Sequence, residues 1–229
     1  MPQESLNNIT TLLASHFDRE QDEPFKRMLA VPVDYWRSKL VTNSLEKHPE
    51  QRKFYKQSII VPMHMVDPIH CPVPMDLCQI SKSVNPIPKT LRLGGILYDY
   101  VGSIDGNQPF REASAGQSDY LKAGRYSKKT IFWGKDNEHI KIINKPNIPS
   151  IRIDGVFDKP IDVMMLNCAS GVDCDYWDMP YPCTGDILQM IIQYILQVDF
   201  QKNNTPMPDE IEVNPNKPKN PQEPQQQPR

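Results

Sequence analysis

The spacing of the apolar residues changes once along this chain of 229 residues, near Ser58, and this change constrains the fold most strongly. Before it, Leu6, Ile9 and Leu13 recur at the three- and four-residue intervals of an amphipathic helix. After it, apolar residues come in short β-branched runs separated by turn residues, which is typical of strands. A chain of this length can bury one well-packed core. We therefore expect an α+β fold in which helices precede a sheet.

Residues 1–57 are predicted to form an N-terminal helical segment with three helices. Ser5 is placed to cap the first helix. The second apolar pattern covers residues 33–45, and Pro32 supplies its start signal. Pro49 suits the first turn of a third, shorter helix.

Residues 58–200 are predicted to form a β-rich core domain that ends in a helix. The hairpin signal is clearest at residues 134–137, where turn residues separate two apolar runs. Pro62 lies inside the first strand candidate, which favours an edge or bulged strand because proline donates no ladder hydrogen bond. The spacing of the candidates favours a mainly antiparallel sandwich or small barrel over βαβ units. The strand candidates are residues 58–66, 77–81, 90–97, 98–104, 130–133, 140–143, 151–157 and 161–166.

Residues 105–129 have turn residues and no sustained period, so they are expected to form a long surface excursion. Four basic residues gather there with two tyrosines between them, a combination that suits a phosphate backbone. An ordinary solvated loop and a protein contact remain open as alternatives. The candidate DNA-facing residues are Lys122, Arg125, Lys128 and Lys129.

The strongest helix signal covers residues 184–200, with Thr184 as its cap. Apolar residues surround this helix except for a stripe formed by Gln189, Gln193 and Gln197. A helix that is apolar on almost every side is buried on almost every side. Either its own domain or a second copy of the chain supplies the cover, and both readings stay open. The candidate subunit-interface residues in the helices are Trp36, Leu40, Ile187, Ile191, Tyr194, Ile195 and Val198.

Residues 201–229 form a tail rich in proline and glutamine, without an apolar period. This composition predicts a segment that is disordered or an extended arm with polyproline II geometry. Residues 208–213 are the exception, because Ile211 and Val213 would fit a strand added to a neighbour's open sheet edge. Both residues are therefore further interface candidates, with disorder as the alternative.

Composition and motifs argue against several classes of function. The net charge of -2 is spread along the chain, so no segment is a general polyanion binder. The longest apolar stretch, residues 187–198, is too short and too polar to cross a membrane, and we expect synthesis in the cytoplasm without a membrane partner. The sequence has no nucleophile elbow, phosphate-binding glycine loop or paired metal-ligand histidines. No catalytic residue, metal or cofactor is therefore expected.

The five cysteines (Cys71, Cys78, Cys168, Cys174 and Cys183) are spaced more widely than the knuckles of structural zinc sites. Reduced, mostly buried thiols are the expected state in a chain large enough to fold without disulfides. A small metal-binding interaction module remains as an alternative function.

Several short phrases, taken in order, give the chain a family resemblance. It resembles virion structural proteins of crAss-like tailed bacteriophages, of the neck ring or head-to-tail adaptor (connector) kind. The resemblance covers about residues 35–200. The phrases are YWRSKL at 35–40, RKFYKQSIIVP at 52–62, MVDPIHCP at 65–72, VNPIPKTL at 84–91, IRIDGVFDKP at 151–160 and YPCTGDILQMIIQ at 181–193.

The resemblance implies a structural protein of the virion neck that has no enzymatic activity. Identical subunits would form a ring, implied to be dodecameric, between the portal protein and the next tail or neck ring. Genomic DNA would pass only transiently through its channel. A second alternative is a tail-associated hydrolytic enzyme whose turnover depends on Glu112 or Asp178.

Overall fold

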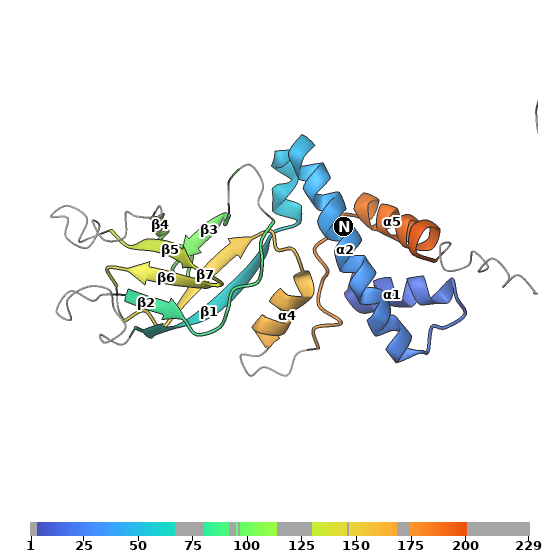
Figure 1. The fold of residues 1–229 in the computed structure, drawn as a ribbon, viewed down its shortest axis with the longest axis horizontal. Helices are drawn as coiled ribbons and strands as arrows, with labels where there is room; N and C mark the ends of the chain where they lie inside the picture. The colour runs from blue at the N-terminus through green and yellow to red at the C-terminus, as the bar shows by residue number, and fades with distance from the viewer. Residues whose placement is uncertain are drawn as a thin grey trace, which may run out of the picture.

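A computed structural model shows a helical part beside a β-barrel, with one further helix between them (Figure 1). The described residues are 4–66, 80–91, 95, 97–113, 130–145, 147–168 and 175–200. The basic cluster at 122–129 and the tail from residue 201 lie outside them, as do Ile211 and Val213. The observed elements confirm the predicted α+β class.

The N-terminal segment contains helices α1 (Leu6–Ser15) and α2 (Glu23–Lys47) and the 3-10 helix η1 (Pro49–Phe54). Ser5 caps α1 by accepting a hydrogen bond from the backbone N–H of Asn8, as predicted. Helix α2 is longer than expected, because Asp22 caps it at the Phe25 N–H.

The predicted helix start at Pro32 is wrong, because Pro32 lies inside α2. An internal proline costs a helix one backbone hydrogen bond and crowds the preceding turn. Leu29, Val33 and Trp36 on either side of it are buried in one hydrophobic cluster, and this packing keeps the helix continuous.

In the described residues, seven strands form one sheet, in the order β3-β7-β1-β2-β6-β5-β4. Neighbouring strands are antiparallel except β4 and β5, which are parallel. The strands are β1 (Gln57–Met65), β2 (Ile80–Ser83), β3 (Tyr100–Gly102), β4 (Arg111–Glu112), β5 (Phe132–Asp136), β6 (His139–Ile143) and β7 (Ser150–Gly155).

The two ends of this sheet approach each other, so the sheet is a nearly closed barrel. Gly102 of β3 bridges Pro109, and the Phe110 N–H donates to the Val101 carbonyl, just before β4 begins. The small-barrel alternative of the sequence prediction is therefore the observed one. Within the predicted excursion 105–129, β4 is an ordered strand, because Phe110 is buried in the barrel core.

Strand β1 is not an edge strand, so the edge prediction drawn from Pro62 is wrong. Residues 57–62 pair with β7 and residues 63–65 pair with β2. The Val84 N–H donates to the Pro62 carbonyl, and the pairing with β2 begins at this point. Pro62, which has no backbone N–H to donate, is therefore tolerated at the point where β1 begins to pair with β2.

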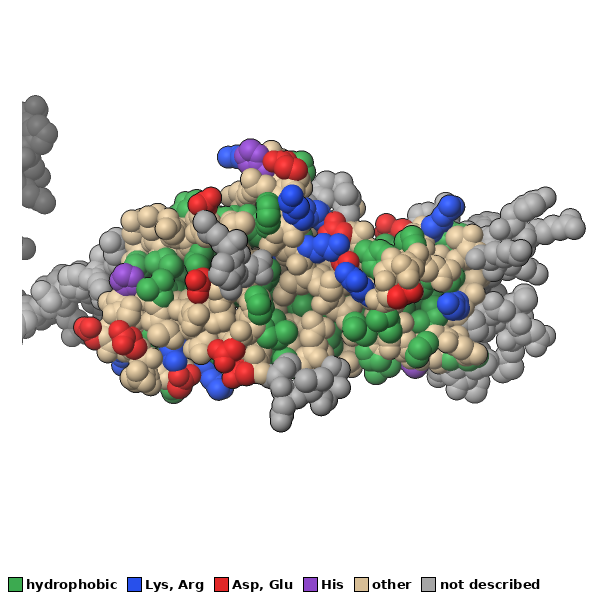
Figure 2. Space-filling view, turned by 180° about the vertical axis from the view of Figure 1, so that it is seen from behind, with side chains coloured by type: hydrophobic (Ala, Val, Ile, Leu, Met, Phe, Trp, Pro, Cys, Tyr) green, Lys and Arg blue, Asp and Glu red, His purple; other side chains and the backbone are tan. Residues whose placement is uncertain are grey.

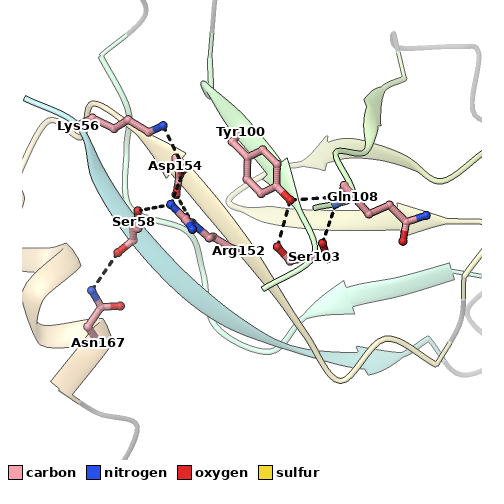
Figure 3. Close-up of polar contacts among 8 residues, drawn as sticks. All are labelled: Lys56, Ser58, Tyr100, Ser103, Gln108, Arg152, Asp154 and Asn167. Carbon is pink, nitrogen blue, oxygen red and sulfur yellow. Dashed lines mark hydrogen bonds and ion pairs between the residues drawn. The ribbon is translucent and has the colours of Figure 1, made fainter. Parts of the chain in front are cut away.

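The segment predicted as a strand at 161–166 is helix α4 (Pro160–Cys168) instead. A short apolar run fits either structure, and here Pro160 and Asp162 occupy the first helical turn. Val163 packs into the barrel core, and Met164 packs into the helical core. Asn167 donates to the Ser58 carbonyl at 3.1 Å, so α4 also covers the side of β1 that β2 leaves open (Figure 3).

Two further sequence predictions have mixed outcomes. The predicted hairpin is confirmed, with its turn at Asn137, which has a positive φ of 55°. Of the described residues in the candidate 90–97, none lies in a strand, and Thr90 makes only an isolated bridge to Phe157.

The predicted C-terminal helix is α5 (Gly185–Tyr194), continued by the π-helical turn η4 (Ile195–Phe200). It packs on α2 and belongs to the hydrophobic cluster of the helical part, not to the barrel core. Only one stripe of it is fully buried, formed by Ile187, Ile191 and Ile195 at four-residue intervals. For this stripe, the interpretation that the helix is covered by its own chain, and not by a second copy, is therefore confirmed.

Candidate assembly surfaces

A buried polar cluster joins α2 to the barrel and to the segment before α5. Arg37, which is completely buried, donates from Nε to the Pro182 carbonyl and from Nη1 to the Phe157 carbonyl, both at 2.9 Å. Tyr181 Oη donates to the Asp34 carboxylate at 2.6 Å. These contacts link residues more than a hundred positions apart, so they fix how the helical part sits on the barrel.

Burial changes the ionisation of this cluster. Loss of hydration raises the pKa of Asp34 to about 6, although the Tyr181 hydrogen bond and the Arg37 charge act in the opposite direction. Burial also raises the pKa of the Cys183 thiol to about 11. Cys183 is thus a protonated thiol at neutral pH, a state that disfavours metal binding and nucleophilic attack.

A second polar cluster holds β7 against β1 on the barrel (Figure 3). Asp154 accepts hydrogen bonds from Arg152 Nε at 2.8 Å and makes an ion pair with Lys56 at 3.1 Å. Burial alone would raise the pKa of Asp154, but hydrogen bonds from Arg152, Ser58 and Lys56 outweigh it and lower the pKa. Tyr100 Oη donates to the Ser103 carbonyl at 3.1 Å and shapes the turn after β3. This cluster stabilises the barrel.

A groove of about 860 Å³ runs along one face of α2. Its opposite wall comes from the start of α4 and from residues 175–177. Val31 and Tyr35 are 71% and 60% exposed, unusually high for side chains of this kind. We call this surface the α2 groove. It is lined by Arg27, Ala30, Val31, Asp34, Tyr35, Ser38, Lys39, Thr42, Asn43, Asp158, Lys159, Ile161, Asp162, Tyr176 and Trp177.

A second apolar surface lies on the outer side of α5. Met190 and Tyr194 are 39% and 40% exposed, and the Tyr194 ring stacks on Trp36 with centroids 4.6 Å apart. Trp36 marks the side of α2 that faces α5. At 100° per residue, Val31 and Ser38 lie roughly 140–160° around the helix from Trp36. The α2 groove and this α5 face therefore lie mainly on opposite sides of α2, and the groove approaches the Trp36 side at Lys39, whose Nζ lies 5.0 Å from the Trp36 ring centroid.

The predicted interface residues divide between core and surface. Trp36, Ile187, Ile191 and Ile195 are buried within the helical core of the chain, whereas Tyr194 is partly exposed. Leu40 and Val198 are half-buried against the same core. A role of these residues in subunit contacts stays a prediction. Sequence reasoning missed Val31 and Tyr35, although with Met28 they form an apolar stripe at i, i+3 and i+7, distinct from the core stripe.

The two alternative functions, a metal-binding module and a hydrolytic enzyme, find little support in the described part of the chain. No group of three or more His, Cys, Asp or Glu residues in it is placed to hold a metal ion. Cys183 has a free thiol, whereas Cys168 is disulfide-bonded, so the prediction of reduced thiols is wrong for Cys168. Glu112 lies on exposed strand β4, and Asp178 accepts a hydrogen bond from Asn7 near α1.

Asp34 is the carboxyl that comes nearest to a general acid, because its pKa is raised and it lines the α2 groove. Its side chain is only 7% exposed, however, and its carboxylate is held by Tyr181. This arrangement is that of a structural contact.

Acidic and basic side chains are interspersed on the face seen in Figure 2, and apolar side chains lie between them. In the part of the chain that the structure describes, no helix has the length and hydropathy needed to cross a membrane.

Comparison with known families defines the class. The fold is a helical part on a small barrel with two exposed apolar surfaces, and surfaces of this kind mark interaction sites. A family model described as phage tail ring protein 2 matches residues 13–223. The chain belongs to this family of ring proteins from crAss-like phages. No individual curated protein matches it significantly.

The family match confirms the resemblance and extends it beyond residues 35–200 at both ends. The chain is thus a structural protein of the virion tail that assembles into a ring. Membership of a structural family also favours a protein without catalytic activity.

Proposed function

We propose that this protein forms a dodecameric ring in the phage neck that connects the portal protein to the next tail ring. The genome passes through the channel of the ring without lasting contact, and no reaction is catalysed. The observation that carries the proposal is the match of a tail ring family over residues 13–223.

The placement of the two apolar surfaces supports ring closure. A ring needs two different surfaces on each subunit, because head-to-tail contacts close a circle whereas one self-complementary surface gives a dimer. Here the α2 groove and the face with Met190 and Tyr194 lie mainly on opposite sides of α2. Each subunit would use these two surfaces to contact two different neighbours.

The proposed portal contact is tested by mixing full-length protein with purified portal and separating complexes by sedimentation. We expect the protein to co-sediment with portal rings in a fixed ratio. Protein that remains at the top of the gradient, with or without the neighbouring ring protein, would contradict a position next to the portal.

The proposed localisation is synthesis in the host cytoplasm followed by incorporation at the neck. It predicts that a label specific for this protein marks virions only at the junction of head and tail.

A further inference from the structure

We propose that the α2 groove binds the proline-rich tail of the adjacent subunit in the ring, through residues 215–224. The inference rests on the proposed ring, because it assigns the partner of one of its surfaces. Two observations carry it. Aromatic side chains line the groove, and prolines recur at regular intervals in the tail sequence.

The tail has a proline at every third position from 215 to 224, namely Pro215, Pro218, Pro221 and Pro224. A polyproline II helix has three residues per turn, so prolines at this spacing line one edge of it. Proline also fixes φ near the polyproline II value, so such a segment loses little entropy when it binds. The family match extends to residue 223 and thus includes three of the four prolines.

The groove has the features that bind polyproline II ridges. Grooves lined by aromatic side chains recognise such segments in other proteins. Tyr35 comes from α2, and Tyr176 and Trp177 come from the opposite wall, with their two rings 5.7 Å apart. Val31 and Ile161 add aliphatic surface beside them.

The α2 groove and residues 215–224 also have similar lengths. The groove follows α2 from Arg27 to Asn43, which is about 24 Å at 1.5 Å per residue. Residues 215–224 span about 28 Å at 3.1 Å per residue in a polyproline II helix. The fourteen residues between Phe200 and Pro215 reach up to about 50 Å when extended, enough to cross to a neighbour.

The side of the molecule from which the tail leaves favours a neighbouring copy over the same chain. The tail follows η4, which continues α5 on the Trp36 side of α2. The groove opens mainly on the opposite side of α2. In a head-to-tail ring, the tail of one subunit thus starts next to the groove of the next subunit, whereas its own groove lies behind α2.

Photo-crosslinking of the full-length chain tests this proposal. Tyr35 is replaced by p-benzoylphenylalanine, which the exposure of this side chain allows without disturbing the core. Equal amounts of ¹⁴N- and ¹⁵N-labelled protein are mixed, irradiated and digested for mass spectrometry. We expect crosslinks from position 35 to the peptide 215–224 that join a light chain to a heavy chain. The same probe at Phe54, an exposed aromatic position on η1 outside the groove, serves as control and should not label the tail.

A pair of tail variants tests the proline ridge itself. Combined Pro218→Ala and Pro221→Ala should abolish the crosslink, while combined Asn216→Ala and Asn220→Ala should retain it, because these asparagines lie off the proline edge. Crosslinks only within one chain, or none to the tail, would overturn the proposal. Rings seen by electron microscopy without tail crosslinks would leave the proposed function standing, and tail crosslinks between chains without closed rings would leave only the tail contact.

Discussion

Arg37 is the single side chain on which the arrangement of the helical part and the barrel depends most. It is fully buried and donates to two carbonyls, one that follows β7 and one that precedes α5. Each such charged hydrogen bond is worth about 1.5–3 kcal/mol, and the cost of burying the charge offsets part of this.

Arg37→Leu should lower the free energy of unfolding by about 2 kcal/mol, because it leaves both buried carbonyls without a donor. Urea denaturation of wild type and variant measures the difference. Lys39→Leu, two positions along the same helix but exposed, should change it by less than about 1 kcal/mol. Equal losses in the two variants would contradict a special role of Arg37.

Because of Asp34, the free energy of unfolding depends on pH, and the sign of this dependence follows from the pKa of Asp34. Its pKa of about 6 in the folded state exceeds the ordinary value of 3.8, so the folded state holds this proton more tightly than the unfolded state. Stability from Asp34 is therefore present at low pH and is lost as the pH rises from about 4 to 6.

Asp34→Asn should remove this dependence, because the amide oxygen still accepts from Tyr181 but does not titrate. Relative to wild type, the variant should gain about 2 kcal/mol in unfolding free energy between pH 4 and pH 7, because a pKa of about 6 replaces the ordinary 3.8 in the folded wild type. Unfolding curves of both proteins at several pH values measure this gain. A constant difference across that range would show that Asp34 titrates normally.

At the scale of elements, predictability followed the strength of the local pattern. Helices α1 and α5 could be predicted because their apolar residues recur over several turns, and Ser5 caps α1 as expected, whereas the predicted cap Thr184 makes no side-chain capping hydrogen bond to α5. Helix α4 could not, because its apolar run is short and becomes helical only by packing between two cores. The helix start predicted at Pro32 was wrong for a similar reason, because tertiary packing outweighs the tendency of a proline to interrupt a helix.

The assembly surfaces were only partly predictable at this scale. The apolar circumference of the last helix indicated that something covers it, but only the structure shows that α2 covers the stripe with Ile191. The α2 groove depends on Tyr176 and Trp177, which come from a distant segment, so no local pattern contains it.

Met190→Asp should leave the fold intact but prevent self-association, because it places a charge on the outer, apolar face of α5 that a neighbour would bury. Gln189→Asp adds the same charge at an exposed polar position of the same helix and is the matched control. Sedimentation velocity at several concentrations measures association, and circular dichroism verifies folding. If both variants associate like wild type, the α5 face is not an interface.

At the scale of the whole molecule, we expect subunits to meet head-to-tail through two different surfaces. The two surfaces lie mainly on opposite sides of one long helix, so each contact leaves the other surface free for a further copy. Such contacts continue until the circle closes.

Electron microscopy of the purified full-length protein, with native mass spectrometry of the same sample, tests this claim most directly. We predict closed rings of one size, with twelve subunits, in which the α2 groove of each subunit faces α5 of its neighbour. A monomer at all concentrations tested, or a two-fold symmetric dimer that buries the same surface on both subunits, would contradict it.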